Sequence, residues 1–399
     1  MKILYGVQGT GNGHISRARA MAEAFQQFPN LEVQWLFSGR PPEKLFAMDT
    51  FGDYWWREGL TFVHKEGKID QLATARQLDL RKLLKDIREL PVNDFDLVIS
   101  DFEPVTAWAA KKRKCPSMGL GHQYAFDYAI PAPAFGWLPR TIMKLFAPVP
   151  LGLGMHWYHF GQPILPPIAH AHEDTVPPEQ DHVLVYLPFE HALPLLQQLA
   201  QLPQKFIVYG LPTDLPKADN ITLKAPSIEG FRHDVATARA IICNSGFELI
   251  AETLTLGKPI LTRPLKGQFE QEANAMALQE LQLARVVKHI DALTIGRWLE
   301  EQPRGVRIDW PDVAHAIVQW ISEGRAEAPQ ELSRRLWQGV IPGQRRTKAE
   351  VQGNSAAVEV DGVEGVEGVE GVEGVEGVEG VEGVEGVEGV EGVEGSEGT

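Results

Sequence analysis

The feature that most constrains this chain is an alternation of short apolar runs with helical patterns along most of its length. In the first half, runs of strand length and segments with helical spacing follow one another in turn, with strands at 3–5, 33–37, 97–100 and 117–120 and helices at 15–25, 80–90 and 105–110. Such alternation is typical of parallel strands, because each helix returns the chain across the sheet. Uninterrupted apolar runs also favour strands that are buried on both faces. The first half is therefore predicted to be a parallel sheet with helices on both faces.

The second half repeats this scheme, with strands at 183–187, 206–209, 240–243 and 260–262 and helices at 192–202, 247–256, 271–281 and 292–301. Asp291 is a plausible N-cap of the last helix. Residues 168–182 are rich in Pro, His and acids and have no periodicity, so we expect a linker there. Two domains of ordinary size follow. We predict these segments: domains 1–167 and 183–325, linker 168–182, and a C-terminal extension 326–355.

The end of the chain differs from the rest. From 363 to 395 the triplet Val-Glu-Gly repeats eleven times, which leaves no apolar face wide enough to offset the entropy of ordering. Residues 356–399 are therefore predicted to be a disordered tail. Residues 359–397 carry fourteen acidic residues and no basic one, against a net charge of −15 for the whole chain. The body is close to neutral, and its charge gives no reason to expect nucleic acid as a partner.

Cysteine content and hydropathy limit the environment of the protein. The two cysteines, Cys115 and Cys243, are too few for a disulfide framework or a Cys-based metal site. The N-terminus lacks the apolar segment of a signal peptide, and no apolar run is long enough to span a membrane. These observations predict a cytoplasmic protein.

A glycine-rich motif, Gly6-Val-Gln-Gly-Thr-Gly-Asn-Gly-His14, follows the first predicted strand and opens the first helix. Glycine lets the backbone approach a ligand, and a helix N-terminus attracts negative charge, so we expect Gly11 and Gly13 to border the ligand. The dinucleotide-binding fingerprint would need a glycine where His14 stands, and the Gly-Lys-Ser/Thr of a P-loop is absent. The alternative is a tight strand-to-helix turn without a ligand.

A second motif, Asn244-Ser-Gly-Phe-Glu-Leu-Ile-Ala-Glu252, follows the strand at 240–243. Ser245 and Gly246 are predicted to begin a helix, with amides that face a phosphate. Glu252 lies two turns beyond Ser245 on the same helix face, where a carboxylate can accept hydrogen bonds from ribose hydroxyls. Glu248, one turn after Ser245, is the competing acid. The alternative is a solvated helix face.

A third motif follows the strand at 260–262 and runs to Asn274. Polar residues at the carboxyl end of a strand lie where open α/β sheets bind ligands. Gln268, Glu270, Gln271 and Asn274 are therefore candidates for reading sugar hydroxyls. The alternative is a polar loop that runs into a solvated helix.

Together, the patterns Ser-Gly-x5-Glu, Gly-Lys-Pro-Ile-Leu and Glu-Gln-x2-Asn-Ala resemble the donor domain of GT-B glycosyltransferases. They are most similar in style to the N-acetylglucosaminyltransferases that complete peptidoglycan lipid intermediates. The N-terminal loop of that family reads Gly-Gly-Thr-Gly-Gly-His, which residues 9–14 follow with Asn12 inserted and the leading glycine lost. The resemblance spans residues 1–325 in layout. It implies two Rossmann-like parallel-sheet domains facing across a cleft, a nucleotide-sugar donor with a UDP-sugar favoured, and no cofactor.

Carried over residue by residue, the resemblance implies that Ser245 and Gly246 contact the diphosphate and that Glu252 binds ribose. Glu270 and Gln271 would hold the transferred sugar. That family has Gln where Glu270 stands and a glycine-rich loop around the position of Asp101. The identities of the sugar and of the acceptor therefore do not transfer, although a lipid-linked or cell-envelope glycan is the acceptor that the resemblance implies.

An inverting transfer needs a base for the acceptor hydroxyl and dipolar groups that stabilise the departing nucleotide diphosphate. His14 is the first candidate for the base. Asp101, at the end of the strand 97–100, either orients His14, as an acid does in the plant small-molecule glycosyltransferases that this arrangement resembles, or is itself the base. Glu103 is the reserve candidate. The fold generally needs no metal, so we expect none.

Two other functions fit the same residues. One is a nucleotide-sugar 2-epimerase of the same fold, and the other is a non-catalytic nucleotide-sugar-binding protein. Residues 129–160 are rich in Pro, Trp and apolar groups, and four basic residues lie at 111–114. This region is either a surface that contacts a membrane peripherally or part of the core and of the acceptor pocket.

Overall fold

The computed structural model describes residues 1–60, 64–65, 68–69, 79–134, 137–169, 178–340 and 344–345. Residues Met1–Glu350 form one compact unit. The predicted tail, part of the predicted linker and the end of the predicted extension lie outside the described residues, so their predictions stay predictions. No helix in the described part of the chain is both long enough and apolar enough to cross a membrane.

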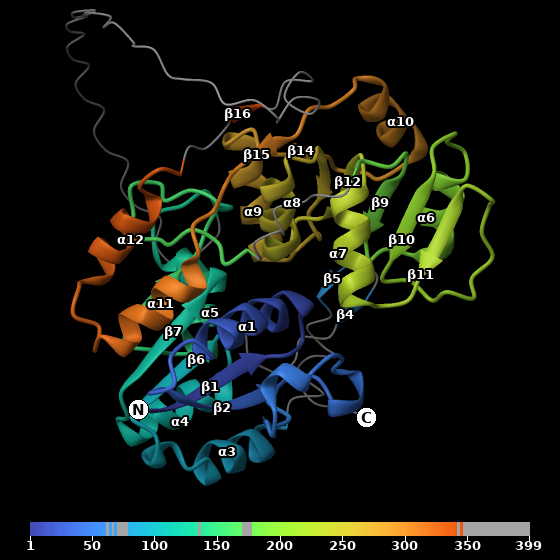
Figure 1. The fold of residues 1–399 in the computed structure, drawn as a ribbon. Coiled ribbons are helices and arrows are strands. Elements are labelled where there is room, and N and C mark those ends of the chain that lie inside the picture. The colour runs from blue at the N-terminus through green and yellow to red at the C-terminus, as the bar shows by residue number, and fades with distance from the viewer. Residues whose placement is uncertain are drawn as a thin grey trace, which may run out of the picture. The chain divides into compact units, whose positions relative to one another are not determined.

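The first sheet has six strands in the order β3-β2-β1-β6-β7-β8, and every pairing is parallel. Its central strands β1, β2, β6 and β7 are labelled in Figure 1. Residues of β1 alternate between its two faces: Ile3 and Tyr5 pack in one core, and Leu4 packs in another. Both faces are covered, as predicted from the apolar runs. The strands are β1 (Lys2–Gln8), β2 (Glu32–Ser38), β3 (Trp55–Trp56), β6 (Leu97–Asp101), β7 (Ser117–Gly121) and β8 (Gly152–Gly154).

Two of the helices beside this sheet begin at well-defined caps. Asp79 caps α3 by accepting from the amides of Arg81 and Lys82, and Pro104 occupies the first turn of α4. The helical elements are α1 (Asn12–Phe25), α3 (Leu80–Glu89), α4 (Pro104–Arg113), α5 (Trp137–Phe146) and the 3-10 turns η1 (Pro42–Lys44), η2 (Asp49–Phe51), η3 (Val92–Asp94) and η4 (His122–Asp127). A short antiparallel pair joins β4 (His64–Lys65) to β5 (Lys68–Ile69).

The second sheet repeats the topology, with six parallel strands in the order β11-β10-β9-β12-β13-β14. Asp291 caps α10 by accepting from the amide of Thr294, as the sequence predicts. The strands are β9 (Val183–Tyr186), β10 (Phe206–Tyr209), β11 (Ile221–Lys224), β12 (Ala240–Asn244), β13 (Ile260–Arg263) and β14 (Arg285–Val286). The helices are α6 (Ala192–Leu199), α7 (Ile228–Thr237), α8 (Phe247–Leu256), α9 (Phe269–Glu280) and α10 (Ala292–Glu300).

The last helices return to the first half of the chain. On α11 (Val313–Ser322), His315 lies 3.1 Å from Gln27 Oε1 through Nδ1, and its ring centroid is 5.3 Å from that of Phe28. On α12 (Pro329–Trp337), the Ser333 hydroxyl donates to the carbonyl of Ile164 at 2.7 Å. An antiparallel pair joins β15 (Val306–Arg307) to β16 (Gln344–Arg345).

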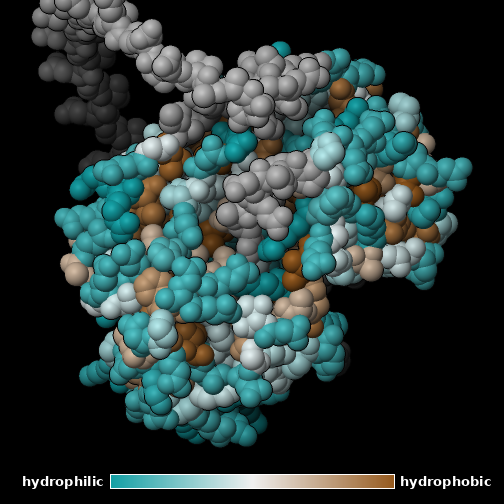
Figure 2. All heavy atoms as spheres, in the orientation of Figure 1, coloured by the Kyte–Doolittle hydropathy of each residue, from teal (hydrophilic) through white to brown (hydrophobic). Residues whose placement is uncertain are grey.

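Figure 2 shows that hydrophilic residues dominate the face in view, in keeping with the burial of the apolar runs.

The predicted fold class, an α/β protein with two Rossmann-like parallel sheets, is confirmed. One boundary was wrong in a way that matters for the site. The first strand continues through Gly6 to Gln8, so the glycine-rich turn begins at Gly9. A Cβ on Gly6 would lie 2.3 Å from Thr106 Oγ1, which shows that this glycine serves the packing of β1 against α4.

Candidate functional site

Three helices begin where strands of the two sheets end. β1 leads into α1, β12 into α8 and β13 into α9, and the N-caps are Gly11, Gly246 and Gln268. None of these caps makes a side-chain hydrogen bond to its helix. First-turn amides of all three helices are therefore free of a capping side chain, as an anion site requires.

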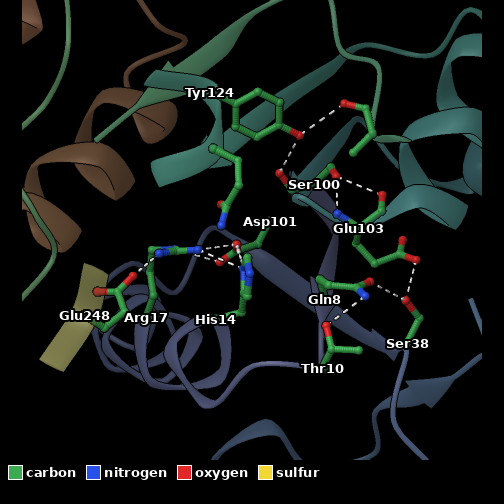
Figure 3. Close-up of polar contacts among 12 residues, drawn as sticks. Gln8, Thr10, His14, Arg17, Ser38, Ser100, Asp101, Glu103, Tyr124 and Glu248 are labelled. Atoms are coloured by element: carbon green, nitrogen blue, oxygen red, sulfur yellow. Dashed lines mark hydrogen bonds and ion pairs between the residues drawn. The ribbon is translucent and has the colours of Figure 1, made fainter. Parts of the chain in front are cut away.

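His14, Arg17 and Asp101 form a polar cluster at the end of β6, in which Arg17 and Asp101 are buried and His14 is partly exposed (Figure 3). His14 lies in the first turn of α1, and its Nδ1 is 2.7 Å from Asp101 Oδ1. Arg17, one turn further along the same helix, donates through Nε to Asp101 Oδ2 at 2.9 Å and through Nη2 to Oδ1 at 2.5 Å. The structure thus brings the predicted pair together and adds an arginine that the sequence analysis missed.

Charge balance sets the state of the two acids around Arg17. Asp101 is fully buried, which by itself raises its pKa, but Arg17 and His14 together hold that pKa below its usual range. Across the two halves of the chain, Arg17 Nη1 also donates to Glu248 Oε1. Burial raises the pKa of Glu248 to about 8, although Arg17 opposes the shift. Asp101 is therefore the anionic partner of Arg17, whereas the raised pKa of Glu248 favours its neutral form at neutral pH.

Glu103, the reserve candidate for the base, has a structural role as the N-cap of α4. Its fully buried carboxylate caps α4, because Oε1 accepts from the amide of Val105 and Oε2 from the amide and hydroxyl of Thr106. The hydroxyl of Ser38 also donates to Oε1, at 2.7 Å. Helix capping occupies both oxygens and keeps them from an incoming acceptor, which argues against Glu103 as the base.

The loop at Asn244–Gly246 differs from its prediction in detail. The Ser245 side chain is fully buried, and its hydroxyl lies 3.0 Å from Thr262 Oγ1. The amide of Gly246 donates to the carbonyl of Asn244 at 2.8 Å. The prediction that the amides of Ser245 and Gly246 both face a phosphate is therefore wrong for Gly246. What remains open is the space at Gly246, where an added Cβ would meet no atom within 4 Å.

Two of the predicted sugar ligands brace loops instead, Asn274 this one and Gln271 the segment between β13 and α9. Asn274 donates through Nδ2 to the carbonyl of Ser245 at 3.0 Å, and its Oδ1 lies 2.7 Å from His122 Nε2. Gln271 accepts from the amide of Leu265 at 3.0 Å. Both amide ends of the fully buried Asn274 are engaged within the protein, so the side chain cannot read sugar hydroxyls as predicted.

Other predicted donor residues lie at contacts between the two halves of the chain. Glu270 Oε2 accepts from Gln123 Nε2 at 3.1 Å, and Glu252 Oε1 accepts from Ser16 at 3.4 Å. The buried side-chain amide oxygen of Gln123, Oε1, has no partner within the described residues. A Cβ on Gly121 would lie 3.3 Å from that oxygen and 3.3 Å from Asp101 Oδ1, so this glycine leaves room for both side chains.

Three other predicted residues, Gly13, Asn244 and Gln268, lie beside or just before the starts of α8 and α9. A Cβ on Gly13 would lie 2.8 Å from Glu248 Cγ, so this glycine permits the approach of α1 to α8. The buried amide oxygens of Asn244 and Gln268 have no partner within the described residues. The sequence Asp94-Phe-Asp96 has the form of a metal-binding motif, but it precedes β6, and Asp96 Oδ2 accepts from the amide of Lys2.

Comparisons with known proteins bear on the fold and the family of the chain. Several solved structures share the fold. The glycotransferase of kitacinnamycin has 14% identity and a TM-score of 0.53, over 85% of this chain and 99% of that one. The S. aureus MnaA-UDP co-structure has 11% identity and a TM-score of 0.52, over 81% and 96%. Arabidopsis thaliana UGT89C1 complexed with UDP has 14% identity and a TM-score of 0.50, over 84% and 97%.

A search of curated proteins found no match. A family model described as glycosyl transferase family 1 matches residues 1–303, which include both sheets and every residue of the site described above. The chain is therefore a GT-B glycosyltransferase that belongs to glycosyl transferase family 1.

Proposed function

We propose that this glycosyltransferase moves a sugar from a nucleotide-sugar donor, with a UDP-sugar favoured, to an acceptor hydroxyl by an inverting, metal-independent reaction. One observation carries the proposal. The His14–Asp101 pair at the end of β6 lies beside the uncapped N-terminus of α8, to which Arg17 joins it through Glu248. A base and a site for an anionic leaving group therefore adjoin. Two structures of the same fold, UGT89C1 complexed with UDP and the MnaA-UDP co-structure, support the choice of nucleotide.

His14 is the proposed base. His14 Nδ1 lies 2.7 Å from Asp101 Oδ1 and 3.0 Å from Arg17 Nη2. In the tautomer that donates to Asp101, Nε2 is left with a lone pair for the acceptor hydroxyl. The charge of Asp101 then stabilises the imidazolium that forms in the transition state. Asp101 is fully buried and saturated by Arg17 and His14, so it is an orienting group in this proposal rather than the base.

The nucleotide diphosphate is proposed to depart at the N-terminus of α8. The helix dipole and the free first-turn amides there favour negative charge without a metal. Glu248 lies in that first turn, and its raised pKa keeps it neutral at pH 7, so it does not repel the diphosphate. Glu252, further along the helix, is proposed to accept from the ribose hydroxyls.

For the transferred sugar, the proposed contacts are Glu270 and the free oxygen of Gln123. The proposed acceptor is a lipid-linked or cell-envelope glycan, as the sequence resemblance implies. Two side chains of α5, Ile142 and Leu145, are 48% and 56% exposed beside the exposed Lys144, which supports a peripheral membrane contact.

A thermal-shift panel of UDP-, GDP-, ADP- and TDP-sugars tests the donor. A ligand that binds only the native state adds about 2.7 kcal/mol at a hundred times its Kd, so the true donor should raise the melting temperature. Glu252→Ala should weaken that donor about ten- to a hundredfold, because it loses charged hydrogen bonds to ribose. Absence of a shift with every nucleotide sugar would contradict the proposal.

A second measurement separates transfer from its alternatives. A transferase releases nucleotide diphosphate only when an acceptor is present. A 2-epimerase would change the sugar without any acceptor, and a binding protein would do neither. The release of nucleotide diphosphate, followed with and without candidate glycan acceptors, therefore distinguishes the three functions.

Donor affinity should fall as the pH rises through about 8, the pKa to which burial raises Glu248. Below that pH the group is neutral, and above it a negative charge develops at the diphosphate site. The expected loss of affinity for the nucleotide sugar is about tenfold between about pH 7 and pH 9. Glu248→Gln, which cannot ionise, should bind equally at both pH values. An equal decline in this variant would assign the effect to another group.

A further inference from the structure

His122 forms a hydrogen-bonded connection between the two halves of the chain. It is the first residue of η4, and its ring is almost fully buried. Its Nδ1 lies 2.8 Å from the carbonyl oxygen of Met155, and its Nε2 lies 2.7 Å from Asn274 Oδ1. Asn274 in turn donates through Nδ2 to the carbonyl of Ser245 at 3.0 Å. The chain of contacts therefore ends on the loop before α8.

The hydrogen atoms in this connection can be assigned by elimination. The carbonyl oxygens of Met155 and Ser245 only accept, and Asn274 has one donating and one accepting end. Turning the Asn274 amide over would place two oxygens against each other at Ser245. The oxygen of Asn274 must then face His122 Nε2, and both ring nitrogens of His122 must carry a hydrogen. All three bonds exist together only when His122 is an imidazolium.

We infer that protonated His122 positions the loop Asn244–Gly246 through Asn274, so that the binding of the nucleotide sugar is coupled to the uptake of one proton from solvent at this ring. The inference rests on the proposed function, which assigns this loop and the start of α8 to the donor. His122 is a positioning residue, because the loop and not the imidazole meets the donor. When the ring loses its Nε2 proton, two lone pairs oppose each other and Asn274 releases one of its partners.

The need for protonated His122 sets the direction of the pH effect, and the groups around the ring set the pH range in which it occurs. Burial lowers the pKa of His122, Glu270 on α9 raises it, and Arg17 on α1 lowers it, with the net pKa below the usual range. His156, whose ring centroid is 5.2 Å away, also has a pKa lowered by burial and by His122 itself. On α8 the facing group is the uncharged ring of Phe247, stacked at 4.0 Å with an interplanar angle of 4°. Donor affinity should therefore be highest at low pH and decline as the pH rises.

The test measures the Kd of UDP-N-acetylglucosamine from about pH 5 to pH 7.5, a range that separates this effect from the titration of Glu248. The diester phosphates of this probe do not ionise in that range. The wild-type Kd should rise about five- to tenfold as the bond to Asn274 is lost. His122→Gln supplies an amide N–H donor that does not ionise, and His122→Phe keeps the stacking on Phe247. In both variants the Kd should therefore not change with pH. At saturating donor, kcat should change little between wild type and His122→Gln, because the effect lies in KM.

His182→Gln is the matched control. His182 is also buried, has a pKa lowered by burial, and lies with Nε2 3.0 Å from the carbonyl of Asp234. It precedes β9, at the opposite end of the second sheet from the donor loop. This variant should keep the wild-type pH profile. A flat profile in His182→Gln, or a wild-type profile in His122→Gln, would overturn the inference.

A second readout separates this inference from the proposed function. Nuclear magnetic resonance of ¹⁵N-labelled histidine side chains, with His122→Gln to assign the signal, reports the protonation of the ring directly. The inference requires two protonated ring nitrogens in the donor complex at about pH 5, and a neutral ring there would overturn it. Failure of every nucleotide sugar to bind at any pH would instead overturn the proposed function, and with it the donor role of His122.

Discussion

His14→Ala should lower the turnover number by roughly 10²–10⁴, the usual contribution of a positioned proton acceptor. Donor affinity should stay within a few fold of wild type, since the proposed donor contacts lie mainly on α8 and α9. The expected split between kcat and KM distinguishes a base from a residue that binds phosphate, whose loss would weaken the donor as well. Steady-state kinetics with the donor and acceptor varied separately provide the measurement.

Asp101→Asn tests the partner of His14. The Asp101 carboxylate accepts from His14 and twice from Arg17, so an amide at this position cannot satisfy all three donors. If Asp101 only orients His14, turnover should fall less than in His14→Ala. If Asp101 is the base, its loss should be the more severe. Near-normal turnover in His14→Ala would remove the histidine from its role and leave Asp101 as the base.

Much of the fold follows from residue patterns, because buried parallel strands are continuous apolar runs. Predicted strands such as 97–100 and 206–209 match β6 and β10 closely. The strands of the two sheets that were missed are the edge strands. Trp55–Trp56, Gly152–Gly154, Ile221–Lys224 and Arg285–Val286 are two to four residues long. Segments this short have no periodicity of their own, and their pairing depends on neighbours distant in the sequence.

The site was predictable where function and local structure share one motif, as at His14 and Asp101. Arg17 stands three residues after His14, on the same face of α1, and that spacing was the one signal that could have found it. The roles of Asn274 and Ser245 were not readable from the sequence. Their partners, His122 and Thr262, are 152 and 17 residues away. A polar side chain beside a ligand site can bind the ligand or brace the loop, and only its contacts distinguish the two.

Arg17→Met should destabilise the protein by about 3–5 kcal/mol, the usual cost of removing one partner from a buried ion pair. The guanidinium is 2% exposed and lies against the fully buried Asp101. Methionine fills a similar volume but leaves this carboxylate in the interior without its cation. At neutral pH the urea midpoint of unfolding should fall and the m-value should stay unchanged. The product of the two gives the free energy of unfolding of each variant.

Arg335→Met is the matched control, because it removes an arginine from an ion pair with Glu327 that is 48% and 29% exposed. That pair lies in solvent, so the expected loss is below about 1 kcal/mol. Adding Asp101→Asn to Arg17→Met should recover part of the stability, because the unpaired buried carboxylate of Asp101 is replaced by a neutral amide. If the double variant is instead less stable than Arg17→Met by the full effect of Asp101→Asn alone, the two residues are energetically independent. The arginine would then owe its importance to the packing of α1 and to its contacts with Glu248 and His14, and not to Asp101.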